Sequence, residues 1–576
     1  MTWHVSAALD QTELAQAEEA ISAATGPGGP LSLDVLLALD DRQEFPADAT
    51  AFLDAIGAAE FYADHPDGDV LRRLPALTAL IRLLARQDLT LAVAHAKTYL
   101  GAACVWVAGD DAQRRRLATQ VRDGAIVSWG LTERGHGGDL LAGQVHAEPS
   151  GDGWSLTGEK WLINNATRAQ LICVLARTSR EGGPRGFSLL LFDKRHAEPG
   201  TWYALPKVPT HGVRGADISG IGFTGAHLRS SALIGRPGTG LETTLKTLQL
   251  TRVAACGLSL GALEHALVLG ADFAQHRTLY GKRLAEVPNI RQTLGRCLAT
   301  LHVAEAVTFA AARLAATATS EMAVASAVAK ALVPELCQEA ISAIGELLGL
   351  RGFLTADEPY RAFQKLDRDH RIVPIFDGST AVCRSLLVEH FPLLARGAPT
   401  ATWDNDLLAV PARSAHVSLL SLLSRRCSLT DQLGPLSEQM TIEAQAGRLP
   451  DRVPALAAAA SAALDATRAR MAGLSWRPHQ VPQEAFDVAR DFELCFAASA
   501  SCHLWAHWRD HGPASAPPLS GQWLGSALAV IEEKLPEQHR TELTHGAAFD
   551  SLAQILLDAR DDDRMPSLSR SGVTAI

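Results

Sequence analysis

The stretch Trp129-Gly-Leu-Thr-Glu-Arg-Gly-His-Gly-Gly-Asp139 is the most informative part of the sequence. The apolar residues that lead into it predict a strand, and Gly135, Gly137 and Gly138 follow in a turn. Glycine lets backbone N–H groups approach a ligand closely, and consecutive N–H groups form an anion-binding concavity. Taken alone, the motif is equally typical of a glycine-rich hairpin in a β domain.

The sequence around this motif has the texture of a small β domain. Short apolar or alternating segments recur up to about residue 236, and Gly, Asp and Pro separate them, which indicates antiparallel strands. The expected strands are Ala125–Gly130, Gln144–Ala147, Trp154–Leu156, Gln170–Leu175, Gly186–Phe192 and Ile218–Phe223.

Helical patterns lie on both sides of the strand-rich region. Before it, Leu71–Arg86 carries apolar residues at helical spacing. After it, the long Ala/Leu-rich segment Leu301–Leu332 predicts a buried bundle helix. Strands and helices therefore segregate along the chain, which disfavours a doubly wound α/β fold.

We predict a mainly α protein of the α+β class with four parts. These are an N-terminal helical domain (1–122), a middle antiparallel β domain (123–236), a C-terminal helical bundle (237–396) and an additional helical domain (397–576). The last part is expected to end in a loose polar tail from Asp561 onward.

Composition excludes several functional classes. The 576 residues carry 53 Lys and Arg against 63 Asp and Glu, and the net charge of −10 argues against a nucleic-acid partner. The nine cysteines are scattered and form no CxxC pair, which favours a reducing, cytoplasmic location and disfavours a metal site. No stretch of about 18 apolar residues lacks a charge, so no membrane span is expected.

A second motif, Gly158-Glu-Lys-Trp-Leu-Ile-Asn-Asn165, follows the glycine-rich stretch. By itself it predicts a hairpin strand in which Asn164-Asn165 tolerates left-handed turn geometry. Together the two motifs resemble the acyl-CoA dehydrogenase family, with its Thr-Glu-x-Gly-x-Gly-Ser-Asp loop and Gly-x-Lys-x-Trp-Ile-Thr-Asn strand. The resemblance covers about residues 1–395. Further blocks follow in the family's order: Leu233–Gly240, Arg252, Ala255–Gly257, Arg277–Lys282, Asp367–Asp369 and Ile375–Ser379.

The resemblance implies an FAD flavoprotein with a four-helix C-terminal bundle. By position, Thr132 is expected at the pyrimidine side of the isoalloxazine ring and Asn164 near its reactive N5. Leu162 stands where the family has Trp against the flavin. Arg277 matches an Arg that reaches the neighbouring subunit's FAD; a solvent-exposed arginine is the alternative. The implied cofactor-binding residues are Trp129, Leu131, Thr132, Gly137, Gly138, Leu162, Asn164, Arg277, Tyr280, Gly378 and Ser379.

The resemblance also implies a catalytic base. In the family a carboxylate removes the α-proton of an acyl thioester, and flavin N5 accepts the β-hydrogen as hydride. Asp377 occupies the position of the family's Glu, and Arg252 matches an Arg near the active site. The alternatives are an N-cap role for Asp377, since Asp and Ser are good caps, and an ordinary bundle-helix role for Arg252.

These residues lead us to expect FAD-dependent dehydrogenation of an acyl thioester on CoA or an acyl carrier protein, in lipid or natural-product biosynthesis. The expected electron acceptor is a flavoprotein. An oxidase-like enzyme that uses O₂ is the first alternative, favoured by Gly135-His-Gly137 and the long C-terminal region. The second is a non-catalytic subunit that pairs with an active paralogue, favoured by Asp377 and Leu162. By resemblance to long family members we expect a homodimer, or a heterodimer in the second alternative.

Overall fold

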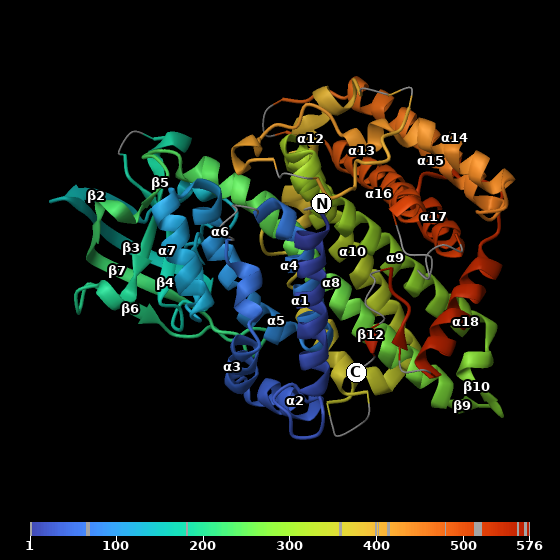
Figure 1. Ribbon diagram of the computed structural model, residues 1–576, viewed down its shortest axis with the longest axis horizontal. Coiled ribbons are helices and arrows are strands. Elements are labelled where there is room, and N and C mark those ends of the chain that lie inside the picture. The colour runs from blue at the N-terminus through green and yellow to red at the C-terminus, as the bar shows by residue number, and fades with distance from the viewer. Residues whose placement is uncertain are drawn as a thin grey trace. The chain divides into compact units, whose positions relative to one another are not determined.

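The computed structural model describes residues 3–64, 70–179, 182–355, 360–397, 400, 402–411, 415–477, 480–511, 521–561, 564–568 and 573–574. The protein is mainly helical with one large β sheet, which confirms the predicted fold class (Figure 1). The chain divides into two compact units, one formed by Ala8–Thr251 and the other by Arg252–Ile576 together with Met1–Ala7.

Helices precede the sheet in the first unit. The predicted helix at Leu71–Arg86 is present as Val70–Gln87, and its apolar stripe is buried. The next helix starts where the Asp88 carboxylate accepts a hydrogen bond from the backbone N–H of Leu91 at 2.8 Å, an N-cap. The helices are α1 (Trp3–Ala23), α2 (Leu33–Arg42), α3 (Ala47–Ala55), α4 (Val70–Gln87), α5 (Leu89–Ala96), α6 (Thr98–Ala108) and α7 (Asp111–Arg122).

The sheet has the strand order β6-β7-β3-β2-β4-β5-β8, with β1 paired to β4. Most neighbours are antiparallel, but β4 pairs in parallel with β1, from Val127↔Leu171 to Gly130↔Val174, and with β2 at His146↔Arg177. The prediction of an antiparallel domain is wrong for these two pairs, because no hairpin joins β4 to either strand. The strands are β1 (Val127–Gly130), β2 (His146–Ser150), β3 (Gly153–Asn164), β4 (Leu171–Arg177), β5 (Phe187–Asp193), β6 (Trp202–Leu205), β7 (Ile218–Arg229) and β8 (Leu233–Ile234).

Strand β3 is much longer than its predicted segment Trp154–Leu156. The register against β7 shifts between Leu156 and Thr157 and again between Trp161 and Ile163. The first shift leaves Gly225 of β7 without a partner, whereas the second leaves Leu162 of β3 without one and so interrupts the alternation of side chains on which a strand prediction depends. The sequence pattern therefore revealed only the first part of the strand.

The second unit is built on a bundle of long helices. The predicted single helix Leu301–Leu332 is wrong: α9 ends at Thr317, and a short 3-10 turn precedes α10. Ala318 has φ −137° and ψ 49°, and it lies among Thr and Ser residues of low helix propensity. The elements are α8 (Gly240–His276, in this unit from Arg252), β9 (Thr278–Leu279), β10 (Lys282–Arg283), α9 (Pro288–Thr317), α10 (Met322–Leu348), α11 (Ala362–His370) and α12 (Thr380–Leu394).

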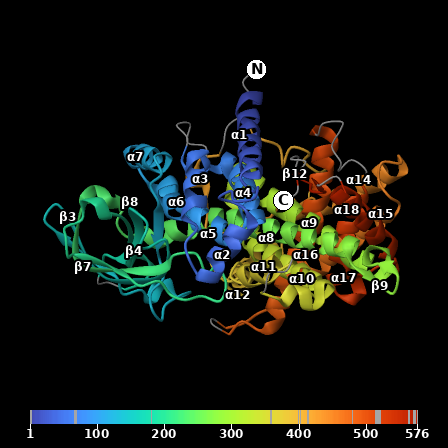
Figure 2. The same cartoon turned by 90° about the horizontal axis from the view of Figure 1, so that it is seen from below.

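The additional C-terminal helices belong to the same compact unit as the bundle. Helices α16, α17 and α18 pack along α9 (Figure 2). Gly295 of α9 lies against the Phe549 backbone of α18, where a Cβ atom would clash, so the two helices approach closely. These helices are α13 (Ser428–Asp431), α14 (Leu433–Gln445), α15 (Arg452–Gly473), α16 (Gln483–His511), α17 (Gln522–Lys534) and α18 (Gly546–Asp561).

The tail predicted to be loose is docked where the structure describes it. Strands β11 (Arg564–Met565) and β12 (Val573–Thr574) pair with each other. Met565 and Leu568 are buried, and Glu305 of α9 accepts hydrogen bonds from Ser567 Oγ at 2.6 Å and Leu568 N at 3.0 Å. The prediction overlooked these apolar side chains. Residues 562–563, 569–572 and 575–576 of the tail lie outside the described residues.

Among the described residues, three helical segments are long and apolar enough to cross a membrane by length and composition alone. They are Leu89–Ala108, Gly240–His276 and Pro288–Thr317. Their apolar windows are 78%, 100% and 89% buried within the protein. Packing against protein is therefore sufficient to account for their apolar composition.

Candidate functional site

The glycine-rich loop after β1 presents an open stretch of backbone. A bridge between Glu133 and His136 closes its turn, and Gly135 adopts φ +91°. Gly137 and Gly138 are exposed, and a Cβ atom on either would have no neighbour within 4 Å. Neither has a left-handed φ, so the folded chain itself does not require glycine there. Both positions leave room for a bound group to contact the backbone.

A buried ion pair supports this loop. Lys160 Nζ of β3 lies 2.7 Å from Glu133 Oε1 and donates a second hydrogen bond to the Leu131 carbonyl at 3.0 Å. The Glu133 carboxylate also accepts from the backbone N–H groups of Gln144 and Val145. Burial alone would raise the pKa of Glu133, but Lys160 and these N–H groups lower it below its ordinary value. The loop therefore rests on an ionised, fully paired carboxylate.

Thr132 connects the loop to the middle of β3. Its Oγ1 donates to the Trp161 carbonyl at 2.6 Å, and the Trp161 N–H donates back to the Thr132 carbonyl at 3.0 Å. The hydroxyl hydrogen of Thr132 is thus used within the chain, while its oxygen retains acceptor capacity toward a ligand.

Leu162 occupies a bulge of β3. It has no register partner on β7, adopts φ +56° and is 43% exposed. A left-handed conformation at a bulky residue costs about 1–3 kcal/mol and clusters at functional sites. Asn165 is also left-handed, at φ +58°, so one of the two asparagines adopts the turn geometry expected from sequence.

Two predicted cofactor residues of this unit hold buried polar atoms that have no partner among the described residues. They are Trp129 Nε1, a donor, and Asn164 Oδ1, an acceptor. The other amide atom of Asn164, Nδ2, donates to the Val93 carbonyl at 3.0 Å. An unpaired buried polar atom costs about 1–3 kcal/mol, which a ligand with both donors and acceptors would recover. These residues fit the FAD that the sequence implies.

Asp377 lies in the loop between α11 and α12 of the second unit. It is half-buried and adopts φ +55°, followed by Gly378 at φ +99°. Ser379, not Asp377, is the N-cap of α12, since its Oγ accepts from the Val382 N–H at 3.3 Å. The alternative interpretation of Asp377 as the helix cap is therefore wrong, and its left-handed backbone needs another explanation.

The structure brings the two predicted catalytic residues together. Arg252 of α8 is buried, and its Nε donates to the Asp377 carbonyl at 3.1 Å. A Cβ atom on Gly378 would lie 3.1 Å from Arg252 Nη2, so glycine allows the guanidinium to pass close to the loop. Arg252 thus has a specific contact with the backbone of the candidate base.

Lys330 of α10 is a residue of this site that the sequence reasoning missed. Its Nζ donates to the carbonyls of Val373 at 2.7 Å and Gly378 at 3.1 Å. The sequence does contain a feature that could have drawn attention to Lys330: no other residue between Met322 and Pro334 is charged.

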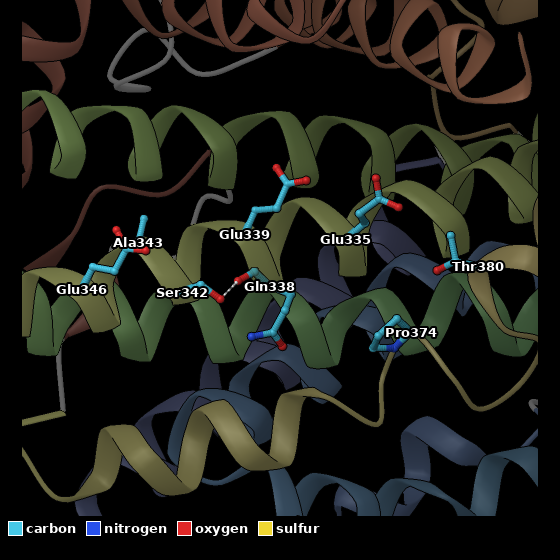
Figure 3. A pocket seen from close by; sticks show the side chains of 8 residues that line it. All are labelled: Glu335, Gln338, Glu339, Ser342, Ala343, Glu346, Pro374 and Thr380. Carbon is cyan, nitrogen blue, oxygen red and sulfur yellow. Dashed lines mark hydrogen bonds between the residues drawn. The ribbon is translucent and has the colours of Figure 1, made fainter. Parts of the chain in front are cut away.

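A pocket of about 550 Å³ lies along α10 beside the same loop (Figure 3). Pro374 and Thr380, which flank the Asp377 turn, form one end of it, and the Thr380 N–H donates to the Pro374 carbonyl at 3.1 Å. Repulsion makes its acidic lining unsuited to a cofactor diphosphate. The lining residues are Glu335, Gln338, Glu339, Ser342, Ala343, Glu346, Pro374 and Thr380.

Arg277 and Tyr280 lie on the β9–β10 hairpin. Tyr280 and Gly281 form its two-residue turn with φ +51° and +81°, the signature of a type I′ turn, and Tyr280 is 97% exposed. In the described part of the chain, no hydrogen bond joins either residue to the other predicted site residues. The described residues also contain no group of His, Cys, Asp or Glu suited to a metal ion.

Comparison with known proteins shows which families this sequence is similar to. The family model described as acyl-CoA dehydrogenase, middle domain, matches residues 128–226, and that of the C-terminal domain matches residues 238–391. A probable acyl-CoA dehydrogenase of Mycobacterium leprae is 27% identical over 354 residues, covering 61% of this chain and 88% of that protein.

Solved structures share the fold. An acyl-CoA dehydrogenase from Bacillus anthracis, complexed with FAD, matches with a TM-score of 0.71 at 16% identity and covers 95% of this chain and 94% of its own. The prolyl acyl carrier protein oxidase AnaB matches with a TM-score of 0.59 at 19% identity, covering 66% of this chain and 98% of its own. The two family models, the relative and the fold all point to the acyl-CoA dehydrogenase family, whose members depend on FAD.

Proposed function

We propose that this protein dehydrogenates the α,β-carbons of an acyl thioester and that Asp377 is its catalytic base. The observation that carries the proposal is the left-handed turn at Asp377, with the buried Arg252 bonded to its backbone. By sequence resemblance, Asp377 in this turn stands at the position of the family's catalytic carboxylate. Strained backbone of this kind persists only where the surrounding structure holds it, and it is enriched at active sites.

FAD, when bound, supplies the acceptor for the β-hydrogen, which leaves as hydride. The residues that would hold it are the open backbone at Gly137 and Gly138, suited to the diphosphate, and Trp129 and Asn164, whose buried Nε1 and Oδ1 have no partner among the described residues. Leu162, exposed in its bulge, offers an apolar surface to the ring.

Asp377 accepts the α-proton in this proposal. A general base of this type contributes about 10²–10⁴-fold to the rate. Asp is shorter than Glu by one C–C bond, about 1.5 Å. A displacement near 1 Å can cost about 10²-fold, so the backbone at residue 377 must deliver the carboxylate to its place.

The thioester carrier is CoA or an acyl carrier protein, and we propose a specialised biosynthetic enzyme. One protein with this fold is a prolyl acyl carrier protein oxidase, which supports testing both carriers. We further propose a cytoplasmic homodimer, with the exposed hairpin of Arg277 and Tyr280 directed to the FAD of the second copy, and a flavoprotein as electron acceptor.

The test is the visible spectrum of the FAD-loaded protein during anaerobic addition of acyl-CoA and acyl-carrier-protein thioesters. Bleaching by one of them supports the proposal and identifies the carrier. Asp377→Asn should slow the bleaching about 10²–10⁴-fold while leaving the bound flavin spectrum unchanged. The matched variant Asp377→Glu should retain a larger fraction of the rate, because it keeps a carboxylate.

Other outcomes separate the alternatives. Fast reoxidation by O₂ without an added acceptor would favour the oxidase. A protein that cannot be loaded with FAD would contradict the enzymatic proposal and favour a non-catalytic subunit. If the flavin of Asp377→Asn were bleached at the wild-type rate, Asp377 would not be the catalytic base.

A further inference from the structure

Lys330 joins the two ends of the loop that carries Asp377. The side chain is fully buried, and its Nζ donates to the carbonyls of Val373 and Gly378 at 2.7 and 3.1 Å. These two carbonyls bracket the segment 373–378. The ammonium also lies 5.7 Å from the ring centre of Phe376, inside the same segment. One side chain of α10 therefore contacts the beginning, the middle and the end of the loop.

If Lys330 served only to stabilise the fold, a buried lysine would be an unfavourable choice, because burying its charge costs free energy. Burial lowers the pKa of Lys330, because a charge removed from water is disfavoured. Its hydrogen bonds go to carbonyl oxygens, and the rest of the helix around it is apolar, so an apolar side chain would fill the same place at lower cost. The charged and titratable groups facing it are Arg252 and Cys256 of α8, His370 of α11, Cys383 of α12, and Asp377.

Lys330 and Arg252 act on consecutive residues. Arg252 Nε donates to the carbonyl of residue 377, and Lys330 Nζ donates to the carbonyl of residue 378. Two consecutive carbonyls held from two different helices fix the orientations of two successive peptide planes, and with them the backbone conformation of Gly378. The first of these planes is joined to the Asp377 Cα, so it also restricts the direction in which the Asp377 side chain leaves the backbone.

We propose that Lys330 is a positioning residue for the catalytic base. Together with Arg252, it holds the Asp377–Gly378 turn in its left-handed conformation, so that the shorter carboxylate is presented in one direction. This inference rests on the proposed function of Asp377. It predicts an effect on the proton-transfer step and little effect on the binding of either FAD or the thioester.

The first test is Lys330→Met in the FAD-loaded full-length protein. Stopped-flow absorbance measures flavin reduction by the thioester that bleaches the wild-type flavin in the spectral test of the proposed function. The limiting rate of reduction should fall about 10²-fold, while the half-saturating thioester concentration changes less than about threefold. The matched control is Lys365→Met, which removes another buried lysine of the same unit, one bonded to Asp369 at 2.6 Å. It should leave the limiting rate within about twofold, whatever its effect on stability.

The second test is a double-mutant cycle. If Lys330 acts through Asp377, adding Lys330→Met to Asp377→Asn should slow reduction no further, whereas independent effects would multiply. Should Lys330→Met fail to fold, Lys330→Gln provides the same comparison, because its amide keeps an N–H donor with a shorter reach. Multiplying effects, or a wild-type rate in a folded Lys330 variant, would overturn the inference while Asp377→Asn still identifies the base. A wild-type rate in Asp377→Asn would instead overturn the proposed function.

Discussion

The glycine-rich loop and the Asp377 turn both rest on a buried lysine, but the two lysines have different partners. Lys160 is paired with a carboxylate, Glu133, at 2.7 Å. Lys330 donates to two backbone carbonyls, those of Val373 and Gly378. In the first region the ion pair itself is the support. In the second, the support acts on the backbone, and the nearby carboxylate belongs to the candidate base.

This difference is consistent with the structural role of the Glu133 carboxylate and the proposed catalytic role of the Asp377 carboxylate. A structural carboxylate is most stable when it is ionised and fully paired, as Glu133 is. A carboxylate that accepts a proton would be made a weaker base by such a pair, since an adjacent ammonium favours the ionised form. Holding the Asp377–Gly378 turn through its backbone constrains the position of the proposed base.

The prediction with the largest expected effect compares the unfolding free energies of two variants, each lacking one of these lysines. Lys160→Met should lower the free energy of unfolding by about 3–5 kcal/mol, because it leaves Glu133 buried and unpaired. Lys330→Met removes hydrogen bonds to two backbone carbonyls and should cost less, because an unpaired neutral carbonyl is less costly than an unpaired buried carboxylate. Urea unfolding of both variants gives the comparison. The control is Glu133→Gln combined with Lys160→Met, which should recover part of the loss; equal losses for the two single variants would contradict the contrast.

A second prediction concerns how α12, which follows the Asp377 turn, is held by the added helices. Arg384 of α12 donates to Glu493 of α16 at 2.9 Å, and Glu335 and Arg490 are the neighbouring charges. Burial raises the pKa of Glu493 to about 7 despite Arg384. The folded state then binds a proton that the unfolded state has lost, so this group's contribution to stability is full below about pH 4.5 and is lost as pH rises to 7.

Glu493→Gln removes this titration. The difference in unfolding free energy between wild type and variant should therefore change by up to about 3 kcal/mol between pH 4.5 and 7, in the direction of a relative gain for the variant at pH 7. Urea unfolding at a series of pH values measures it. A difference that does not vary with pH would show that Glu493 stays ionised throughout.

The smallest effect concerns the cofactor in the first region. Trp129→Phe keeps the aromatic ring but removes the Nε1–H, which has no acceptor among the described residues. If FAD accepts this hydrogen bond, its affinity should fall by up to about tenfold, measured by flavin fluorescence titration of the apoprotein. Trp154→Phe, in the same sheet, is the control and should leave the affinity unchanged. Unchanged affinity in Trp129→Phe would exclude this contact.

Much of the fold and part of the site could be predicted from sequence. Glycine spacing and strand texture indicated the loop after β1, and the ordered blocks predicted Asp377 and Arg252 as site residues, which the structure brings into contact. The break at Ala318 was missed because Thr and Ser are only weak helix breakers, so propensity alone does not end a helix there. The length of β3 was missed because the bulge at Leu162 interrupts its alternation.

The sequence by itself determined the order of helical and strand-rich segments, the family, and which residue types stand at the candidate catalytic positions, because these depend on local spacing. Only the tertiary structure decided that β1 pairs in parallel with β4, that Ser379 caps α12, and that Lys330 reaches the loop of Asp377. Those features join residues about 40 to 50 positions apart, or depend on one backbone conformation. Such contacts form only when helices and strands pack together, and no local pattern encodes them.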